Sequence, residues 1–415
     1  MFHPEDIDMG RMLGQLSEIS SVSSSPDGGV TRCTFNPAFL ASMSLVAGWM
    51  NEIGLEVRFD RWGNLYGRYA CAGGGSSILA GSHLDSVQNG GNFDGLLGVL
   101  SALEAVRLIK QAGIELAKDI EIVAFIEEEG NVFQKLLLGS LLATGQISKQ
   151  EISGLQNEEG EAFLDILKKI QFPYPVEPEK TLHENVESYL ELHLEQARLL
   201  ETNQKSVGLV TSIAGLKVFR VDLIGQADHA GSTAYADRRD TLLAAAEMIT
   251  ALRRIGLELF PSTARITVAK IEVIPGMTNV VAGETVFNID TRSADVETAK
   301  TVESEIRSLV SKLSEKHQLK YDIQVLSDSP AVITATRMRK AIEKGIEKSG
   351  LDQMDLVSWA VHDALALSKV TDVGMIFVRC LDGRSHCPEE FVSPEDIADG
   401  TAVFANTLIE LASTT

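Results

Sequence analysis

The order of strands and helices changes near residue 215, and this change constrains the fold more than any other feature of the sequence. Six segments there follow one another in the order β-α-β-β-α-β, with two-residue alternation in the strands and helical spacing between them. They are residues 216–225, 238–256, 264–274, 284–293, 296–317 and 319–326. This order is that of a ferredoxin-like α+β unit, which we predict inside the chain.

On both sides of this unit, short apolar strands alternate with helical patterns. Residues 77–83 and 119–126 are strand-like, residues 95–111 have helical spacing, and residues 71–77 read as a glycine-rich loop between strands. Residues 373–380 form another buried strand, followed by a helix with a capping signature. The flanking parts therefore predict an α/β domain, a central mixed sheet flanked by helices, into which the α+β domain is inserted.

The distribution of charge indicates the same division. The 415 residues carry a formal charge of -21, but residues 213–328 contain 14 basic and 16 acidic residues, so most of the negative charge lies outside them. We therefore predict a catalytic domain built from residues 1–212 and 329–415, with residues 213–328 as a separate domain. An acidic surface repels phosphate groups, which argues against nucleic acid and anionic membranes as partners.

Two further features predict a cytoplasmic protein. The N-terminal residues have neither a basic nor an apolar signal region, and residues 34–51 read as an amphipathic helix capped by Asn36 and not as a membrane span. The four cysteines form no C-x-x-C pair, which is typical of reduced thiols in a chain of this length. They are Cys33, Cys71, Cys380 and Cys387.

Candidate metal ligands gather at the ends of the predicted strands. His83 ends an apolar strand beside a glycine-rich loop, Asp85 follows it, and Asp94 lies at the start of the next helix. A carboxylate there can bridge two cations, and Asp85 can orient the imidazole. A turn histidine followed by an N-capping aspartate is the alternative.

The run Glu127-Glu128-Glu129 directly follows a second strand. Adjacent carboxylates at a strand end repel one another unless a cation lies among them, although a solvated acidic loop is the alternative. His193 lies on a third strand, where Glu191 and Glu195 are expected on the same face.

His386 follows the last strand and completes a set of nitrogen and oxygen ligands without a thiolate. The set is His83, Asp94, Glu129, His193 and His386. It suits Zn, Mn, Co or Ni with open coordination positions. No H-E-x-x-H, P-loop or serine-hydrolase motif occurs in the sequence.

Seven segments, spread in order over nearly the whole chain, read GSHLDSVQNGGNFDG, EEEGNVF, YLELHLEQA, QADHAGSTAYADRRD, NVVAGETVFNIDTRSAD, HDA and DGRSHCPEE. Together they resemble the hydantoinase/carbamoylase family of amidases. The family includes N-carbamoyl-L-amino-acid and allantoate amidohydrolases and is related to carboxypeptidase G and the aminoacylases. The resemblance implies a homodimer with a lid and dimerisation domain, and two divalent metal ions per subunit.

The resemblance also implies a role for each matching residue. Asp94 would bridge the metals, with His83 and His193 at one site and Glu129 and His386 at the other. Glu128 would be the general base for metal-bound water, and Asp85 would support His83. The lid would supply the remaining residues: His229 to stabilise the oxyanion from the partner subunit, and Asn279 and Arg292, with Gln196 of the catalytic domain, to bind the substrate carboxylate.

The sequence departs from the family pattern around the expected substrate pocket. Val132, Ala197, Ala234 and Val361 stand where relatives carry other residues. We therefore expect a dimetal amidohydrolase that cleaves the carbamoyl or ureido C–N bond of a small carboxylate substrate. An aminoacylase or dipeptidase of the wider superfamily, and a non-catalytic binding protein that retains the fold, are the alternatives.

Overall fold

The computed structural model describes residues 1–71, 75–177, 182 and 185–413. It divides into two compact units, each described by itself below. Unit 1 comprises residues 1–211, 334–356 and 362–415, and unit 2 comprises residues 212–333 and 357–361. The loop expected at residues 71–77 includes residues 72–74, which lie outside the described residues.

A mixed sheet with ten strands among the described residues is built mainly from unit 1, while its short edge strand at residues 332–333 belongs to unit 2. Its strands are β1 (Glu56–Asp60), β2 (Leu65–Tyr69), β3 (Ser77–His83), β4 (Asp119–Phe125), β5 (Val176–Glu177), β6 (Val186–Leu194), β7 (Val207–Ile213), β14 (Val332–Ile333), β15 (Asp355–Ser358) and β16 (Asp372–Val378). Their order is β14-β7-β16-β6-β3-β4-β2-β1-β5, with β15 paired to β7. The four central strands β16, β6, β3 and β4 are parallel, so their carboxyl ends share one edge.

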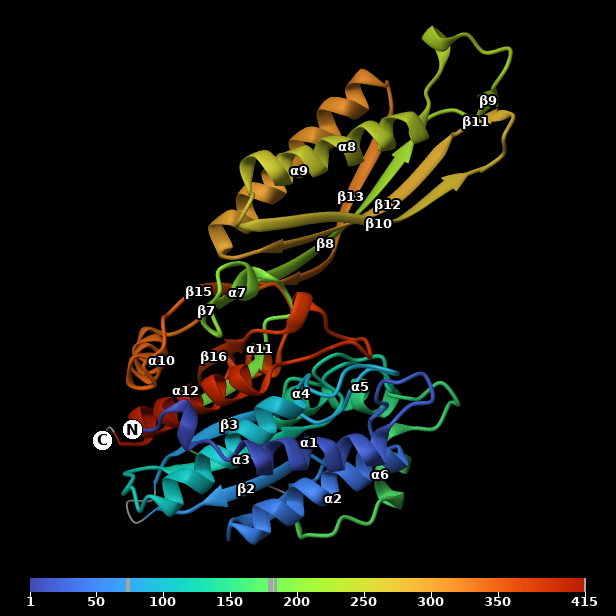
Figure 1. Cartoon of the computed structure of the whole chain (residues 1–415). Coiled ribbons are helices and arrows are strands. Elements are labelled where there is room, and N and C mark those ends of the chain that lie inside the picture. The colour runs from blue at the N-terminus through green and yellow to red at the C-terminus, as the bar shows by residue number, and fades with distance from the viewer. Residues whose placement is uncertain (72–74, 178–181, 183–184, 414–415) are drawn as a thin grey trace. The chain divides into compact units, whose positions relative to one another are not determined.

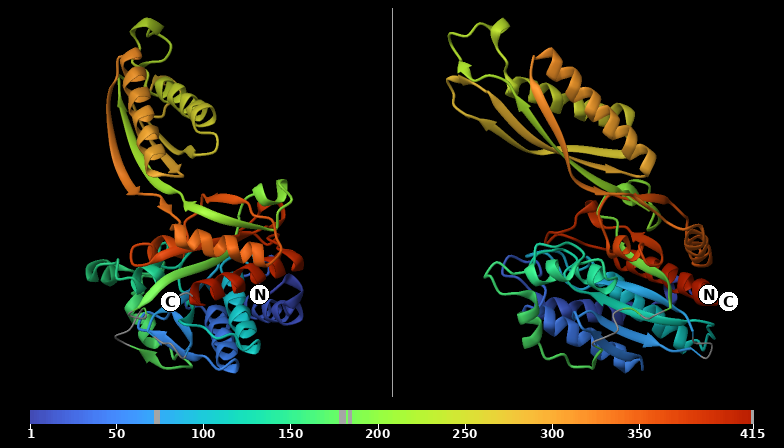
Figure 2. Two further views of the ribbon diagram at one scale, coloured as in Figure 1. Left: turned by 90° about the vertical axis from the view of Figure 1, so that its left-hand side faces the viewer. Right: turned by 180° about the vertical axis from the view of Figure 1, so that it is seen from behind.

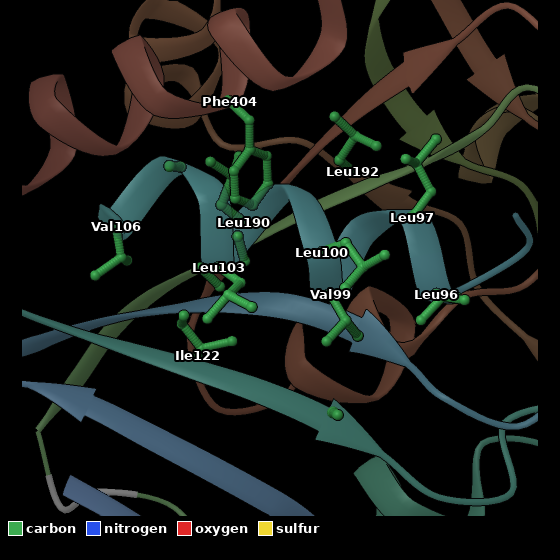
Figure 3. Close-up of a cluster of buried hydrophobic side chains, with 14 of the residues drawn as sticks. Leu96, Leu97, Val99, Leu100, Leu103, Val106, Ile122, Leu190, Leu192 and Phe404 are labelled. Carbon is green, nitrogen blue, oxygen red and sulfur yellow. The ribbon is translucent and has the colours of Figure 1, made fainter. Parts of the chain in front are cut away.

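Helices cover this sheet (Figure 1). They are α1 (Met9–Ser23), α2 (Pro37–Glu52), α3 (Leu96–Gln111), α4 (Leu138–Ala143), α5 (Lys149–Gly154), α6 (Phe163–Lys169), α7 (Leu199–Thr202), α10 (Thr336–Lys348), α11 (Asp363–Leu367) and α12 (Pro394–Ser413), with short 3-10 turns at Pro4–Asp6 and Leu381–Gly383. The buried helix α3 meets Phe404 of α12 and Leu190 and Leu192 of β6 in the apolar core shown in Figure 3. The helix predicted after Asn36 is confirmed as α2, and the Asn36 side chain caps it by accepting a hydrogen bond from the Phe39 amide.

Unit 2 has the predicted ferredoxin-like topology. Its strands are β8 (Gly215–Ile224), β9 (Asp228–His229), β10 (Ala264–Ile274), β11 (Val280–Val281), β12 (Glu284–Ser293) and β13 (Lys320–Ser329). The main sheet has the antiparallel order β10-β12-β8-β13, and β9 pairs with β11. Helices α8 (Thr241–Leu259) and α9 (Val296–Lys316) both cover one face of the main sheet, as Figure 2 shows, and a 3-10 turn spans Tyr235–Asp237.

The helices of the described residues include none that is both long enough and apolar enough to span a lipid bilayer. The predicted fold class, an α/β sheet domain with an inserted ferredoxin-like domain, is confirmed.

Candidate metal centre

The four parallel central strands bring the predicted ligands of unit 1 to one edge of the sheet. His83 is the last residue of β3, His193 is the penultimate residue of β6, and Glu129 lies four residues beyond the end of β4. His386 lies in the loop after β16. Since carboxyl ends of parallel strands are the usual ligand edge of an α/β sheet, this arrangement explains how residues 300 positions apart converge.

Asp94 lies in the loop that joins β3 to α3 and occupies the centre of the cluster. Its Oδ1 atom is 2.9 Å from His193 Nε2 and 3.6 Å from His83 Nε2, while its Oδ2 atom is 3.3 Å from His386 Nε2. The two oxygens thus face two different groups of side chains. Asp94 does not cap α3, because the capping position is Gly95, so the N-cap alternative does not hold.

The first group contains His83, Asp94 and His193, whose ligand atoms all lie within 4.8 Å of one another. Each imidazole faces a backbone carbonyl through Nδ1: His83 faces the Asp85 oxygen at 3.0 Å and His193 faces the Leu194 oxygen at 3.1 Å. Because a carbonyl only accepts, the neutral rings carry their protons on Nδ1. Both Nε2 lone pairs therefore point toward the buried Asp94 Oδ1, and this donor set fits a cation.

The second group contains Asp94, Glu129 and His386. His386 Nε2 is 3.1 Å from Glu129 Oε1, and the two carboxylates raise the pKa of His386 to about 10. Because both groups share Asp94, the residues fit two cations bridged by one carboxylate. A third group, Glu191, His193 and His362, shares His193 with the first.

The acidic run after β4 is held in place by Asp85. The Asp85 carboxylate accepts from the backbone amides of Glu128 at 3.0 Å and Glu129 at 3.2 Å. Glu127 has a left-handed backbone with φ of 50° and accepts from the Val132 and Phe133 amides. Glu127 and Glu128 are buried, so the solvated-loop alternative does not hold.

Glu128 lies beside the first group, with Oε2 at 3.9 Å from His83 Nε2. Burial is the main cause that raises the pKa of Glu128, and nearby carboxylates act in the same direction against His83. A buried carboxyl group with a raised pKa beside a ligand cluster is suited to proton transfer.

The remaining predicted site residues lie in both units. Gln196 belongs to unit 1 and donates from Nε2 to Asp94 Oδ2 at 2.9 Å. His229 is an exposed residue of unit 2 whose Nδ1 accepts from the amides of Gly231 and Ser232, so its proton is on Nε2. Asn279 accepts from the Ala230 amide through its backbone oxygen, and Arg292 donates to the Trp359 carbonyl.

Several residues around the centre were not predicted from the sequence. Glu390 accepts from the amides of Phe93 and Asp94 at 2.8 and 3.0 Å, and Ser385 lies within hydrogen-bond distance of both Glu390 and Asp94. The ring centre of His362 lies 4.3 Å from the ring centre of His193. The segments DGRSHCPEE and HDA contain these residues, but neither segment indicates which of its members contacts the centre.

The position of Glu195 differs from the expectation. We expected Glu191 and Glu195 on the face of His193, and Glu191 does lie in β6, where it accepts from Ser82 at 2.8 Å. Glu195 lies beyond the strand and accepts from the Leu199 and Leu200 amides, which begin α7. It therefore caps a helix.

Comparisons with known proteins show which family the chain belongs to. The family model described as peptidase family M20/M25/M40 matches residues 79–410. The chain is 35% identical over 408 residues to an N-carbamoyl-L-amino acid amidohydrolase of Geobacillus stearothermophilus, covering 97% of this chain and 98% of the relative. It is 32% identical over 404 residues to an allantoate amidohydrolase of Escherichia coli (strain K12), with 95% and 96% covered.

Solved structures show the same relationship. An amidase of the hydantoinase/carbamoylase family from Burkholderia multivorans matches with a TM-score of 0.89 and 30% identity, over 98% of each chain. A dinuclear metal-binding M20 peptidase from Bacillus subtilis shares the fold, with a TM-score of 0.68 and 11% identity over 98% of this chain and 99% of that one. The chain therefore belongs to the M20/M25/M40 peptidase family and, within it, to the hydantoinase/carbamoylase amidases, and it is an amidohydrolase acting on C–N bonds other than peptide bonds.

Proposed function

We propose that the protein is a dimetal amidohydrolase that cleaves the carbamoyl or ureido C–N bond of a small substrate bearing a carboxylate. The observation that carries the proposal is the position of Asp94 between two groups of ligands, with Glu128 beside them. The relatives named as N-carbamoyl-L-amino acid and allantoate amidohydrolases support the substrate class.

In this proposal the five ligands His83, Asp94, Glu129, His193 and His386 hold the metals. Two divalent cations, once bound, lower the pKa of water and polarise the carbonyl group of the substrate. Glu128 accepts a proton from the attacking water and delivers it to the leaving nitrogen, a task that suits a buried carboxyl group with a raised pKa. Asp85 acts as a positioning residue because it fixes the backbone of Glu128.

Unit 2 supplies a neutral hydrogen-bond donor in this proposal. With Nδ1 occupied as an acceptor, His229 presents an Nε2–H group that can stabilise negative charge on the substrate oxygen. Arg238 braces this loop by donating to the carbonyls of Thr233 and Ala230 at 3.0 and 2.6 Å. Arg292 and Asn279, with Gln196, bind the substrate carboxylate, because a guanidinium group suits a carboxylate. We also propose that residues 213–328 form a lid and dimerisation domain between catalytic segments 1–212 and 329–415.

Metal analysis combined with a substrate panel tests this function. We expect two divalent ions per chain and release of ammonia from N-carbamoyl amino acids or allantoate, without comparable hydrolysis of N-acetyl amino acids or dipeptides. Preferred hydrolysis of the last two would favour an aminoacylase or dipeptidase instead.

Substitution of the proposed base is the sharper test. Glu128→Gln is expected to lower kcat by at least about 1000-fold while the metal content stays at the wild-type level. The exposed Glu158→Gln is a matched control and should leave both unchanged. A wild-type kcat in Glu128→Gln would remove Glu128 from the role of base.

A further inference from the structure

Two arginines of unit 2 face each other across neighbouring strands. Arg265 of β10 is the direct partner of Arg292 of β12, so both side chains project from the same face of the sheet. It is the face opposite α8 and α9, because the alternate residues Ile266 and Ile289 pack into the helix-covered core. Like charges in directly opposed positions destabilise a sheet, which makes the pair a candidate for function.

One carboxylate accompanies this pair. Asp290 Oδ1 lies 3.6 Å from Arg292 Nε, and both side chains are more than a third exposed. Arg265 uses Nη1 to donate to the carbonyls of Pro261 and Ala264 at 3.2 and 2.9 Å, so its guanidinium group is anchored to the chain. This end of the sheet keeps an excess of positive charge, and Arg292 is the member available for an incoming carboxylate.

Trp359 connects the two arginines. Its ring centre lies 4.3 Å from the Arg265 guanidinium carbon, and its backbone carbonyl accepts from Arg292 Nη1. The neighbouring Ser358 carbonyl accepts from the Ala214 amide at 2.8 Å, which fixes the segment. Trp359 is itself partly exposed. An aromatic surface of fixed orientation therefore stands next to the guanidinium group that we assign to the substrate carboxylate.

We infer that Trp359 determines substrate specificity and that the preferred substrates are N-carbamoyl α-amino acids with an apolar or aromatic side chain. The inference rests on the proposed function, because it takes Arg292 as the carboxylate anchor. When the carboxylate lies on Arg292, the substituent on the adjacent carbon lies within reach of the indole. An apolar substituent gains contact there, whereas a second ureido group or a hydroxyl group loses water without a matching partner. Arg265 is a positioning residue that holds the indole.

The experiment measures kcat/KM of the metal-loaded, full-length enzyme by ammonia release. The substrates are N-carbamoylphenylalanine, N-carbamoylleucine, N-carbamoylglycine and allantoate. We expect the first two to exceed the last two by about tenfold or more. Trp359→Ala should remove most of this preference, mainly through a higher KM, while N-carbamoylglycine changes less than about threefold. Trp359→Phe should restore much of the preference.

Arg265→Gln tests the positioning role and should lower the preference less than Trp359→Ala does. The matched control is Arg61→Gln, since exposed Arg61 lies 4.6 Å over Trp62 in unit 1 in the same kind of contact. Arg61→Gln should leave kcat/KM unchanged for all four substrates. Thermal unfolding identifies any variant that fails to fold. If Trp359→Ala does not fold, Trp359→Phe and Arg265→Gln still test the inference.

Three outcomes would overturn the inference. A wild-type preference for allantoate or N-carbamoylglycine would overturn the inference alone. Equal losses for all substrates in Trp359→Ala, with no recovery in Trp359→Phe, would reduce Trp359 to a structural role. Failure of the metal-loaded wild type to release ammonia from any of the four compounds would overturn the proposed function as well.

Discussion

A methyl group added at Gly95 tests the geometry of the metal centre directly. Gly95 precedes α3 with φ of 66°, and a Cβ atom there would lie 2.4–2.5 Å from three ring atoms of His83. Ordinary contacts of a Cβ atom begin near 3.4 Å, so the imidazole has to move away by about an ångström. Gly95→Ala therefore displaces a proposed ligand without changing its chemistry.

The cost of Gly95→Ala has two parts. A side chain at positive φ costs at least about 1–2 kcal/mol, and ψ of -55° places Gly95 outside the left-handed helical region, so the cost there is at the upper end. Displacing His83 breaks its contact with the Asp85 carbonyl and strains a close-packed region, which adds about 2–3 kcal/mol. Gly113→Ala isolates the first part, because Gly113 has φ of 63° and no atom within 4 Å of its added Cβ.

Urea unfolding in the presence of a chelator measures these costs, and elemental analysis after dialysis against metal measures the ions bound. We expect Gly113→Ala to lose about 1–2 kcal/mol and to keep the wild-type metal content. Gly95→Ala should lose about 3–5 kcal/mol and at least one ion per chain. If Gly95→Ala matched Gly113→Ala in stability and kept all its metal, His83 could not be a ligand in the position described.

Three further predictions concern residues that support the fold and the site. Glu390→Ala leaves the part-buried Phe93 amide and the buried Asp94 amide without an acceptor. Titration calorimetry should therefore show metal affinity about tenfold weaker, with Glu390→Gln nearer wild type. Burial raises the pKa of Asp60 from 3.8 to about 6, so the folded state binds this proton more tightly than the unfolded chain does. The free energy of unfolding should therefore fall by about 3 kcal/mol as pH rises from about 4 to 6. Urea unfolding across that range should show that Asp60→Asn lacks this component. Arg238→Lys should loosen the loop that carries His229 and lower kcat about tenfold with little change in KM. Steady-state kinetics on one ureido substrate measures both constants, and a rise in KM alone would contradict the bracing role.

The strands and the ligand edge could be predicted because the relevant signals are local. The apolar run before His83 and the apolar run before Glu127 each predict a buried strand, and both strands are fully buried in the structure. In a parallel sheet, residues that follow such strands meet at one edge whatever their separation in sequence. Knowing the strand type was therefore enough to bring His83 and Glu129 into one region.

The supporting contacts could not be predicted, because they join distant parts of the chain through geometry that has no local pattern. Glu390 reaches the loop of Asp94 across 296 residues, and nothing in its own neighbourhood distinguishes it from Glu389. The prediction for Glu195 was wrong for the opposite reason, because its local pattern was misleading. Its spacing from His193 fits a strand face, but β6 ends at Leu194 and the next residues turn into α7.

The burial of acidic groups at this edge explains why the centre suits divalent cations. Burial is the main cause that raises the pKa of Glu127 to about 7 and that of Asp363 to about 8. The fully buried Arg32 adds one positive charge nearby, and burial lowers its own pKa to about 10. Protonated histidines offset part of the remaining negative charge, since the neighbouring carboxylates raise the pKa of His386 to about 10. Divalent cations would take the place of these protons on the imidazole nitrogens and supply the positive charge instead. The apolar strands that bury the carboxylates therefore also favour metal binding.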